Sequence, residues 1–261
     1  MSFPYKHCLA IGATSGIGRA LASRLIEAGI KVTVVGRRQE RLDEFVNSHG
    51  HENAKGVAFD IARLEDIPRF AADVIAKSPD IDCLFLNAGI QNPYELDSAQ
   101  QFDLASFHEE VKVNFSSFVS LVHAFLPYFK KNPNPTSFVF TGSNLAIIPA
   151  ASLPAYSASK AALNAFTLCL REQLRHSKTK VIEISPPPVQ TELHDYMGEE
   201  AGRGMGMPLD AFTQQAYEGL VEGKDQIVIG SIGSAETFHE IIDKRRAAFA
   251  DLARVIRGGK P

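Results

Sequence analysis

Short apolar runs alternate with longer segments of helical period along the whole chain. The apolar runs predict strands at residues 7–11, 31–35, 56–59, 82–86, 137–141, 181–185 and 226–229. The segments between them predict helices at residues 17–28, 40–48, 64–77, 104–131, 156–177 and 210–222. Most of these strands are apolar throughout, as parallel strands covered by helices on both faces must be. The pattern therefore predicts an α/β chain that forms a single doubly wound domain over residues 1–261, with a seven-stranded parallel sheet and helices on both faces.

Two stretches interrupt this alternation. Residues 190–207 follow the sixth predicted strand and contain four glycines, Gly198, Gly202, Gly204 and Gly206. We interpret the segment at about 190–210 as a substrate lid, with a disordered insertion as the alternative. His194 and Met197 within it could contact substrate, or could have an incidental role at the surface. Residues 234–259 predict a basic helical tail, for which a solvated helix face or a packing arm is the simplest role.

The composition narrows the possible partners and the compartment. Hydrophobic residues at 45% and charged residues at 22% exclude a disordered or fibrous chain. A net charge of −3 provides no field that would attract nucleic acid or an anionic membrane. The three cysteines, Cys8, Cys83 and Cys169, lie far apart inside apolar runs, which is typical of reduced core thiols and not of a metal site. Because the first residues also lack an apolar signal core, we expect a cytoplasmic protein with no metal, membrane or nucleic-acid partner.

A glycine-rich turn joins the first predicted strand to the first predicted helix. Glycines at this place allow the backbone to approach a pyrophosphate, and the N-terminus of the helix that follows attracts its negative charge. The spacing is G-x-x-x-G-x-G, which by itself is also compatible with a purely structural turn. At the end of the first strand of a doubly wound pattern, it predicts a nucleotide site. The candidate contacts in this turn are Gly12, Thr14, Ser15, Gly16, Ile17 and Gly18.

The residues that follow the next strands favour one form of the nucleotide. An acidic residue after the second strand would bind the adenosine ribose hydroxyls and favour NAD, but Arg37 and Arg38 stand there. Either guanidinium could bind a ribose phosphate, so we expect NADP(H) to be favoured over NAD(H), by about 10- to 100-fold for one well-made contact. The alternative is a solvated basic helix start. Further candidate contacts follow the third and fourth strands: Asp60, Ile61, Asn87, Ala88 and Gly89.

A second group of residues suggests proton transfer. Tyr156 and Lys160 lie four residues apart at the start of a predicted helix, so their side chains share one face. A tyrosine ionises near pH 10, and a neighbouring ammonium would lower that pKa. Ser143 ends the fifth strand, and a loop could bring its hydroxyl beside Tyr156. Asn114 lies inside a predicted helix, where a buried structural amide is the alternative role.

Together these motifs resemble the short-chain dehydrogenase/reductase family over essentially the whole chain. The family's glycine pattern matches Gly12, Gly16 and Gly18, and its N-A-G motif matches residues 87–89. The resemblance implies a Rossmann-type fold and a homodimer or homotetramer paired through the long helices. It implies that Tyr156 and Lys160 also contact the cofactor. It further implies a catalytic tetrad of Asn114, Ser143, Tyr156 and Lys160, and cofactor contacts near the nicotinamide from Pro186, Val189 and Thr191.

The chain departs from the family pattern at three places. Ile11 stands where a threonine precedes the first glycine, Leu86 replaces an asparagine, and Pro187 replaces a glycine. The segment P-P-P-V-Q-T-E-L at residues 186–193 resembles the DltE-like subgroup of oxidoreductases.

The function implied is reversible hydride transfer between NADP(H) and a carbonyl or alcohol substrate, with Tyr156 as general acid and base. The altered positions motivate one alternative, a non-catalytic NADP-binding regulatory or scaffold protein. A Rossmann-type methyltransferase is disfavoured, because its reaction requires neither the arginine pair nor the tyrosine–lysine pair. A hydrophobic substrate is favoured by apolar residues in the loops that would line its pocket: Ile147, Ile148, Pro149, Leu153, Pro188 and Val189.

Overall fold

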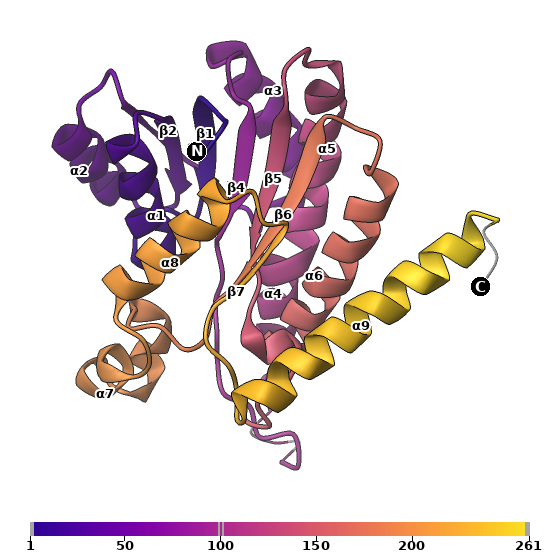
Figure 1. Ribbon diagram of the computed structural model, residues 1–261. Coiled ribbons are helices and arrows are strands. Elements are labelled where there is room, and N and C mark those ends of the chain that lie inside the picture. Colours follow the sequence, from indigo (N-terminus) through magenta and orange to yellow (C-terminus); the bar gives the residue numbers. More distant parts are fainter. Residues whose placement is uncertain (1–2, 99, 101, 259–261) are drawn as a thin grey trace.

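The computed structural model describes residues 3–98, 100 and 102–258 and is built around one parallel sheet (Figure 1). Its strand order is β3-β2-β1-β4-β5-β6-β7. This confirms the predicted α/β fold with a seven-stranded parallel sheet. The strands are β1 (His7–Ile11), β2 (Lys31–Gly36), β3 (Ala54–Ala58), β4 (Cys83–Leu86), β5 (Thr136–Thr141), β6 (Thr179–Ser185) and β7 (Gln226–Val228).

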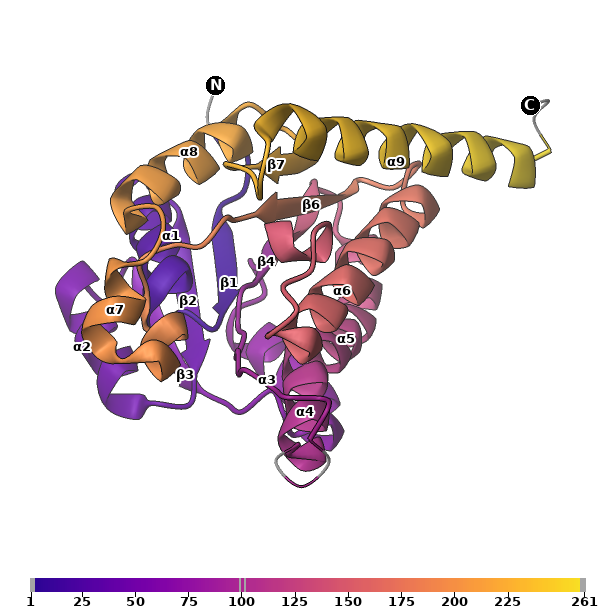
Figure 2. The ribbon, with the colours of Figure 1, turned by 90° about the horizontal axis from the view of Figure 1, so that it is seen from below.

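Helices cover the two faces of the sheet. One layer holds α1, α2 and α8, and the other holds α3, α4, α5 and α6 (Figure 2). Each layer closes its own apolar core against the sheet. No helix in the described part of the chain is long and apolar enough to cross a membrane. The helices are α1 (Gly16–Glu27), α2 (Gln39–His49), α3 (Ile67–Lys77), α4 (Leu104–Val111), α5 (Ser117–Lys131), α6 (Pro154–Gln173), α7 (Glu199–Gly204), α8 (Leu209–Val221) and α9 (Ala235–Ile256).

The long helix predicted at residues 104–131 is interrupted. A π-helical turn, Lys112–Ser116, separates α4 from α5. Asn114 in this turn binds the backbone of Ile90, and the Ser117 hydroxyl donates to the Val113 carbonyl at 2.7 Å. Side chains that bond to the backbone in this way compete with the regular helical ladder, which accounts for the local break.

The segment at 190–210 contains short helices. Glu192–Met197 forms a 3₁₀ helix and α7 follows it. The two ends of the segment meet, because Gln190 N–H donates to the Met207 carbonyl at 3.0 Å and Val189 forms a parallel bridge with Met207. The closed segment lies beyond β6, and its role as a lid stays a prediction.

The basic tail forms one long helix, α9, which projects away from the body of the molecule (Figure 2). Arg246 fixes its middle by bonds to Asp225 and Gln226 beside β7. Residue 259 of the predicted tail and residues 1–2 and 260–261 of the predicted domain lie outside the described residues. The prediction that all three cysteines are core thiols is wrong for one of them. Cys8 and Cys83 are buried, but Cys169 is exposed on α6.

Sheet topology determines where a ligand can bind. β1 pairs with β2 on one side and with β4 on the other. The chain therefore reverses its direction of winding between β1 and β4. In open parallel sheets, ligands bind beyond the carboxyl ends of the strands at such a switch point.

Candidate active site

The glycine-rich turn after β1 forms the floor of the site. Gly12 has a φ of +78°, and a Cβ at this position would come within 2.4 Å of Ala88 Cα, so no larger residue fits. Ser15 precedes α1 without capping it through its side chain, which leaves backbone N–H groups of the first turn free for an anion. All the predicted contacts of this turn line the cavity except Gly18, which packs beneath it against Gly12 and Asn87.

The N-A-G motif after β4 forms the neighbouring wall. Asn87 donates to the Gly12 carbonyl at 3.0 Å and accepts from the Thr141 hydroxyl at 2.9 Å. This side chain therefore joins the ends of three strands, β1, β4 and β5. Ala88 and Gly89 line the cavity beside it. The motif therefore lines this part of the cavity and also holds the ends of the strands around it in place.

One arginine is held at the adenosine end. Arg38 donates to the Thr14 hydroxyl at 2.8 Å and to the Ser15 hydroxyl at 2.9 Å. Arg37 also lines the cavity, and both arginines are exposed. Asp60 and Ile61 line the same end.

Sequence reasoning missed Glu192 at this end. Its carboxylate accepts from Arg41 at 2.8 Å and from Arg38 at 3.3 Å. Both arginines lower the pKa of Glu192, so it is charged at neutral pH. Glu192 and Arg41 are 151 residues apart, and no local pattern indicates their contact.

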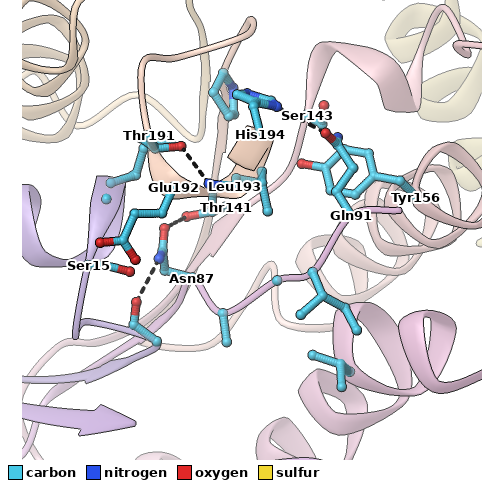
Figure 3. Close-up of a pocket in the computed structure, with 18 of the residues that line it drawn as sticks. Ser15, Asn87, Gln91, Thr141, Ser143, Tyr156, Thr191, Glu192, Leu193 and His194 are labelled. Atoms are coloured by element: carbon cyan, nitrogen blue, oxygen red, sulfur yellow. Dashed lines mark hydrogen bonds between the residues drawn. The ribbon is translucent and has the colours of Figure 1, made fainter. Parts of the chain in front are cut away.

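Ser143 and Tyr156 lie together at the inner end of the cavity (Figure 3), and Lys160 lines the same cavity. Tyr156 and Lys160 share one face of α6, as the spacing predicted, and all three side chains are buried. Lys160 Nζ donates to the Thr141 carbonyl at 2.8 Å and lies 5.5 Å from the centre of the Tyr156 ring. Leu145 N–H donates to Ser143 Oγ at 3.1 Å, which leaves the Ser143 hydroxyl hydrogen available for another acceptor.

Burial dominates the electrostatics of this end. It raises the pKa of Tyr156 to about 12, although the neighbouring Ser143 hydroxyl lowers it. It lowers the pKa of Lys160 to about 8, although the carboxylates of Glu183 and Glu110 raise it. Within the protein itself Lys160 therefore does not bring the tyrosine below its usual pKa, contrary to expectation, because the desolvation of the phenolate is the larger effect.

Glu183 and Glu110 are two further groups that the sequence reasoning missed. Glu183 on β6 is fully buried and accepts from Asn164 at 2.8 Å and from Thr167 at 3.0 Å. Glu110 on α4 is fully buried and accepts from the Asn92 backbone at 3.0 Å. Both carboxylates act on Lys160 from outside the cavity wall.

Asn114 lies behind the cavity wall and not on it. Its amide accepts from Ile90 N–H at 2.9 Å and donates to the Ile90 carbonyl at 2.9 Å and the Ser159 hydroxyl at 3.2 Å. A Cβ on Gly89 would lie 3.5 Å from Asn114 Oδ1 and 3.8 Å from Lys160 Nζ, so both groups pack against the N-A-G motif. Its catalytic role stays a prediction.

The residues that line the rest of the cavity match the predicted ones only in part. Pro186, Val189 and Thr191 line it, as do Leu153 and Pro188 of the predicted apolar pocket. Ile147, Ile148 and Pro149 are absent from the lining, so that expectation is wrong. Met197 is also absent from it and is exposed, in agreement with the alternative of a surface role. Further polar residues line the cavity, among them Gln91, His194 and Tyr196; of these three, only His194 was singled out from the sequence.

The cavity, about 720 Å³, runs from Arg38 and Asp60 past the glycine-rich turn to Tyr156. It offers N–H groups for a pyrophosphate, a guanidinium and a carboxylate for an adenosine, and hydroxyl groups at the far end. These residues fit a nicotinamide dinucleotide. Comparison with known proteins supports the same conclusion: the family described as short chain dehydrogenase matches residues 6–202.

The chain belongs to the short-chain dehydrogenase/reductase family. It is 34% identical to "Uncharacterized oxidoreductase DltE" of Bacillus subtilis over 84% of this chain and 86% of that protein. It is 31% identical to "NADP-dependent 3-hydroxy acid dehydrogenase YdfG" of Salmonella typhimurium over 68% of this chain and 70% of that protein.

Solved structures of the family share the whole architecture. A short chain dehydrogenase from Burkholderia cenocepacia in complex with NADP has a TM-score of 0.76 and 26% identity, and the alignment covers 97% of this chain and 99% of that one. A family member from Burkholderia phymatum in complex with NAD has a TM-score of 0.78 at 19% identity, covering 100% and 98%, which shows the fold alone. This short-chain dehydrogenase/reductase is thus an oxidoreductase of a family that typically uses a nicotinamide cofactor.

Proposed function

We propose that this chain is an NADP(H)-dependent oxidoreductase that interconverts a ketone or aldehyde and an alcohol. The observation that carries the proposal is the position of three buried groups. Ser143, Tyr156 and Lys160 stand at the inner end of one cavity whose outer end holds Arg38 against the glycine-rich turn. A dinucleotide along this cavity would bring its nicotinamide to the hydroxyl groups.

In this proposal the chain's residues polarise the substrate and move a proton. The cofactor, when bound, supplies the hydride to the carbonyl carbon. Ser143 donates its free hydroxyl hydrogen to the substrate oxygen. Tyr156 gives its phenolic proton to the same oxygen as negative charge develops there, and Lys160 stabilises the resulting phenolate. The products are an alcohol and the oxidised cofactor, and in the reverse direction Tyr156 accepts the proton.

The raised pKa of Tyr156 is consistent with this role. A phenol that keeps its proton at neutral pH is ready to act as the acid in reduction. The ammonium of Lys160 can stabilise the phenolate only when the lysine is charged, and Glu183 and Glu110 favour that charged form. The positive charge of the oxidised nicotinamide would add to that stabilisation.

The preference for NADP(H) is supported by Arg38. Two hydroxyl groups of the glycine-rich turn already orient its guanidinium at the adenosine end. A guanidinium held at this place can bind a phosphate through charge-assisted hydrogen bonds from its remaining N–H groups. YdfG, an NADP-dependent relative, agrees with this choice.

A cofactor and substrate screen tests the proposal. The purified protein is mixed with NADPH or NADH and a panel of ketones and aldehydes, and the loss of absorbance of the reduced nicotinamide is followed. We expect turnover of at least one carbonyl compound, with NADPH preferred. Tight NADPH binding without turnover of any panel member or of the matching alcohols with NADP would favour a non-catalytic NADP-binding protein.

A further inference from the structure

Three polar side chains form a connected group on the substrate side of the cavity. Gln91 follows the N-A-G motif, and His194 and Tyr196 belong to the segment beyond β6. Gln91 Oε1 accepts from the Tyr196 hydroxyl at 3.2 Å and lies 3.1 Å from His194 Nδ1. All three residues line the cavity that holds Ser143 and Tyr156, and Figure 3 shows Gln91 and His194 in it.

The hydrogen bond between Gln91 and His194 determines which donor and which acceptor remain for a ligand. Because the Gln91 carbonyl oxygen can only accept, His194 Nδ1 carries the hydrogen. A neutral imidazole then has an acceptor at Nε2, and burial, which lowers the pKa of His194, favours the neutral ring. The Gln91 amide nitrogen is a donor. If the amide were turned over, His194 Nε2 would donate and Gln91 would accept, so the pair presents one donor and one acceptor either way.

Both groups remain open to the cavity. Gln91 Nε2 and His194 Nε2 have no hydrogen-bond partner within the described part of the chain. Neither is among its fully buried polar atoms that lack a partner, which are on Glu110, Ser137, Asn144 and Arg171. A donor and an acceptor therefore face the cavity with their hydrogen bonds unmade.

The surroundings exclude an anionic ligand group here. Among the described residues that line the cavity, the cationic ones are Arg37 and Arg38 at the adenosine end, and Lys160, which is bonded to the Thr141 carbonyl. Apolar side chains such as Leu145 and Leu153 line the cavity together with the uncharged Asn92 and Asn144 and the acidic Glu109. A carboxylate would meet an acceptor at the imidazole and find no cation at Gln91, whereas a hydroxyl both donates and accepts.

The donor and acceptor line the same cavity as Ser143 and Tyr156. Gln91 is two residues beyond Gly89, where a Cβ would lie 3.8 Å from Lys160 Nζ. Tyr196, bonded to Gln91, is near enough to Tyr156 to raise its pKa. A group held by Gln91 and His194 would belong to an atom close to the carbonyl carbon.

We propose that Gln91 and His194 form a subsite for an uncharged hydroxyl on the carbon next to the reacting carbonyl. The substrate class is then an α-hydroxy ketone in reduction and a vicinal diol in oxidation, with an apolar substituent against the remaining wall. The inference rests on the proposed oxidoreductase function and specifies its substrate.

Two ketones of nearly equal shape test the subsite. 2-Hydroxyacetophenone carries the hydroxyl, and propiophenone has a methyl group in its place; phenylglyoxylate carries a carboxylate. With NADPH we expect kcat/KM for the hydroxy ketone to exceed those for the other two by at least about tenfold, because a pair left unbonded disfavours an analogue that lacks the hydroxyl. Gln91→Met and His194→Phe should each reduce the preference over propiophenone, measured as the ratio of the two kcat/KM values within each variant, to less than about threefold.

A matched control and a binding measurement separate the possible outcomes. Gln214→Met makes the same substitution on the exposed face of α8 and should leave the preference unchanged. In Tyr156→Phe with NADP bound, calorimetry should show the hydroxy ketone binding at least about tenfold more tightly than propiophenone. Equal kcat/KM for the two ketones, or equal binding, overturns the subsite while leaving the oxidoreductase intact. If no carbonyl compound is turned over but the binding preference holds, the subsite stands and the proposed function fails.

Discussion

Tyr156 and Lys160 are buried groups whose pKa values burial moves in opposite directions. The tyrosine keeps its proton to about pH 12 and the lysine loses its proton near pH 8. Each shift disfavours a charged form in a low-dielectric site. Glu183 and Glu110 act against the shift of the lysine, so the charge on Lys160 at neutral pH depends on carboxylates that do not line the cavity.

The first prediction concerns stability and Lys160. Its pKa is about 8 in the folded chain and 10.5 without the fold, so the unfolded chain binds more protons between these values. Stability therefore rises with pH across this window. Relative to Lys160→Met, the wild-type free energy of unfolding should gain on the order of 2 kcal/mol from pH 7 to pH 10. Urea unfolding of both proteins at four pH values provides the measurement.

Tyr156 has the opposite effect on the free energy of unfolding, and at higher pH. Its folded pKa of about 12 lies above its unfolded value of 10.0, so the stability that it contributes is lost as pH rises from 10 towards 12. The comparison with Lys160→Met cancels this effect, because both proteins retain Tyr156. If the free energies of unfolding of the two proteins changed in parallel between pH 7 and pH 10, the lowered pKa of Lys160 would be contradicted.

At the scale of elements, the cofactor end joins the start of α2 to the segment after β6. Glu192 binds Arg38 and Arg41 across more than 150 positions of the chain. Both arginines are exposed, but Arg38 is bonded to the glycine-rich turn, whereas the Arg37 side chain makes no hydrogen bond within the described part of the chain. The two neighbouring arginines are therefore not equivalent, although the sequence alone does not distinguish them.

The second prediction separates these arginines. Arg38→Gln should weaken NADP binding by about 10- to 100-fold and NAD binding by less than about threefold, because only NADP has the additional phosphate. Arg37→Gln, the matched control, should have a smaller effect on NADP. Isothermal titration calorimetry with both cofactors measures this. An equal loss of affinity for NAD and NADP in Arg38→Gln would show that Arg38 supports the turn and does not read the phosphate.

The third prediction concerns the carboxylate opposite Arg38. Glu192→Gln removes a negative charge that lies 3.3 Å from the guanidinium. Because this charge competes with a phosphate for Arg38, the variant should bind NADP several-fold more tightly and NAD unchanged. The same titrations test it. Weaker NADP binding would indicate instead that Glu192 orients Arg38 for the phosphate.

At the scale of the whole molecule, the sequence predicted what depends on local pattern. The strands buried on both faces were recognised from continuous apolar runs. Strand β3 was placed two residues too late, because this edge strand includes the exposed Lys55. The π-helical turn could not be predicted, since it depends on bonds from Asn114 to Ile90, 24 residues away.

The residues of the candidate site likewise include some that a local pattern predicts and others that only long-range contacts reveal. Motif residues such as Ser143, Tyr156 and Lys160 could be named from spacing and family resemblance. Gln91 could not, because its chemistry arises from contact with His194, 103 residues later in the chain. Glu183 likewise looks like an ordinary polar position until β6 is packed against α6.

The fourth prediction is the oligomeric state. The family resemblance leads us to propose a homodimer or homotetramer paired through the long helices. Sedimentation equilibrium at several concentrations should give two or four times the chain mass. A single-chain mass at every concentration would contradict this proposal without affecting the site.

The central claim is that Tyr156 transfers the proton at the inner end of the cofactor cavity. Tyr156→Phe removes the hydroxyl alone and retains the buried ring. With a ketone that the wild type reduces, stopped-flow absorbance should show hydride transfer slowed by at least about 10³-fold in the variant, while calorimetry shows that NADPH still binds. Hydride transfer at the wild-type rate in Tyr156→Phe would contradict the account.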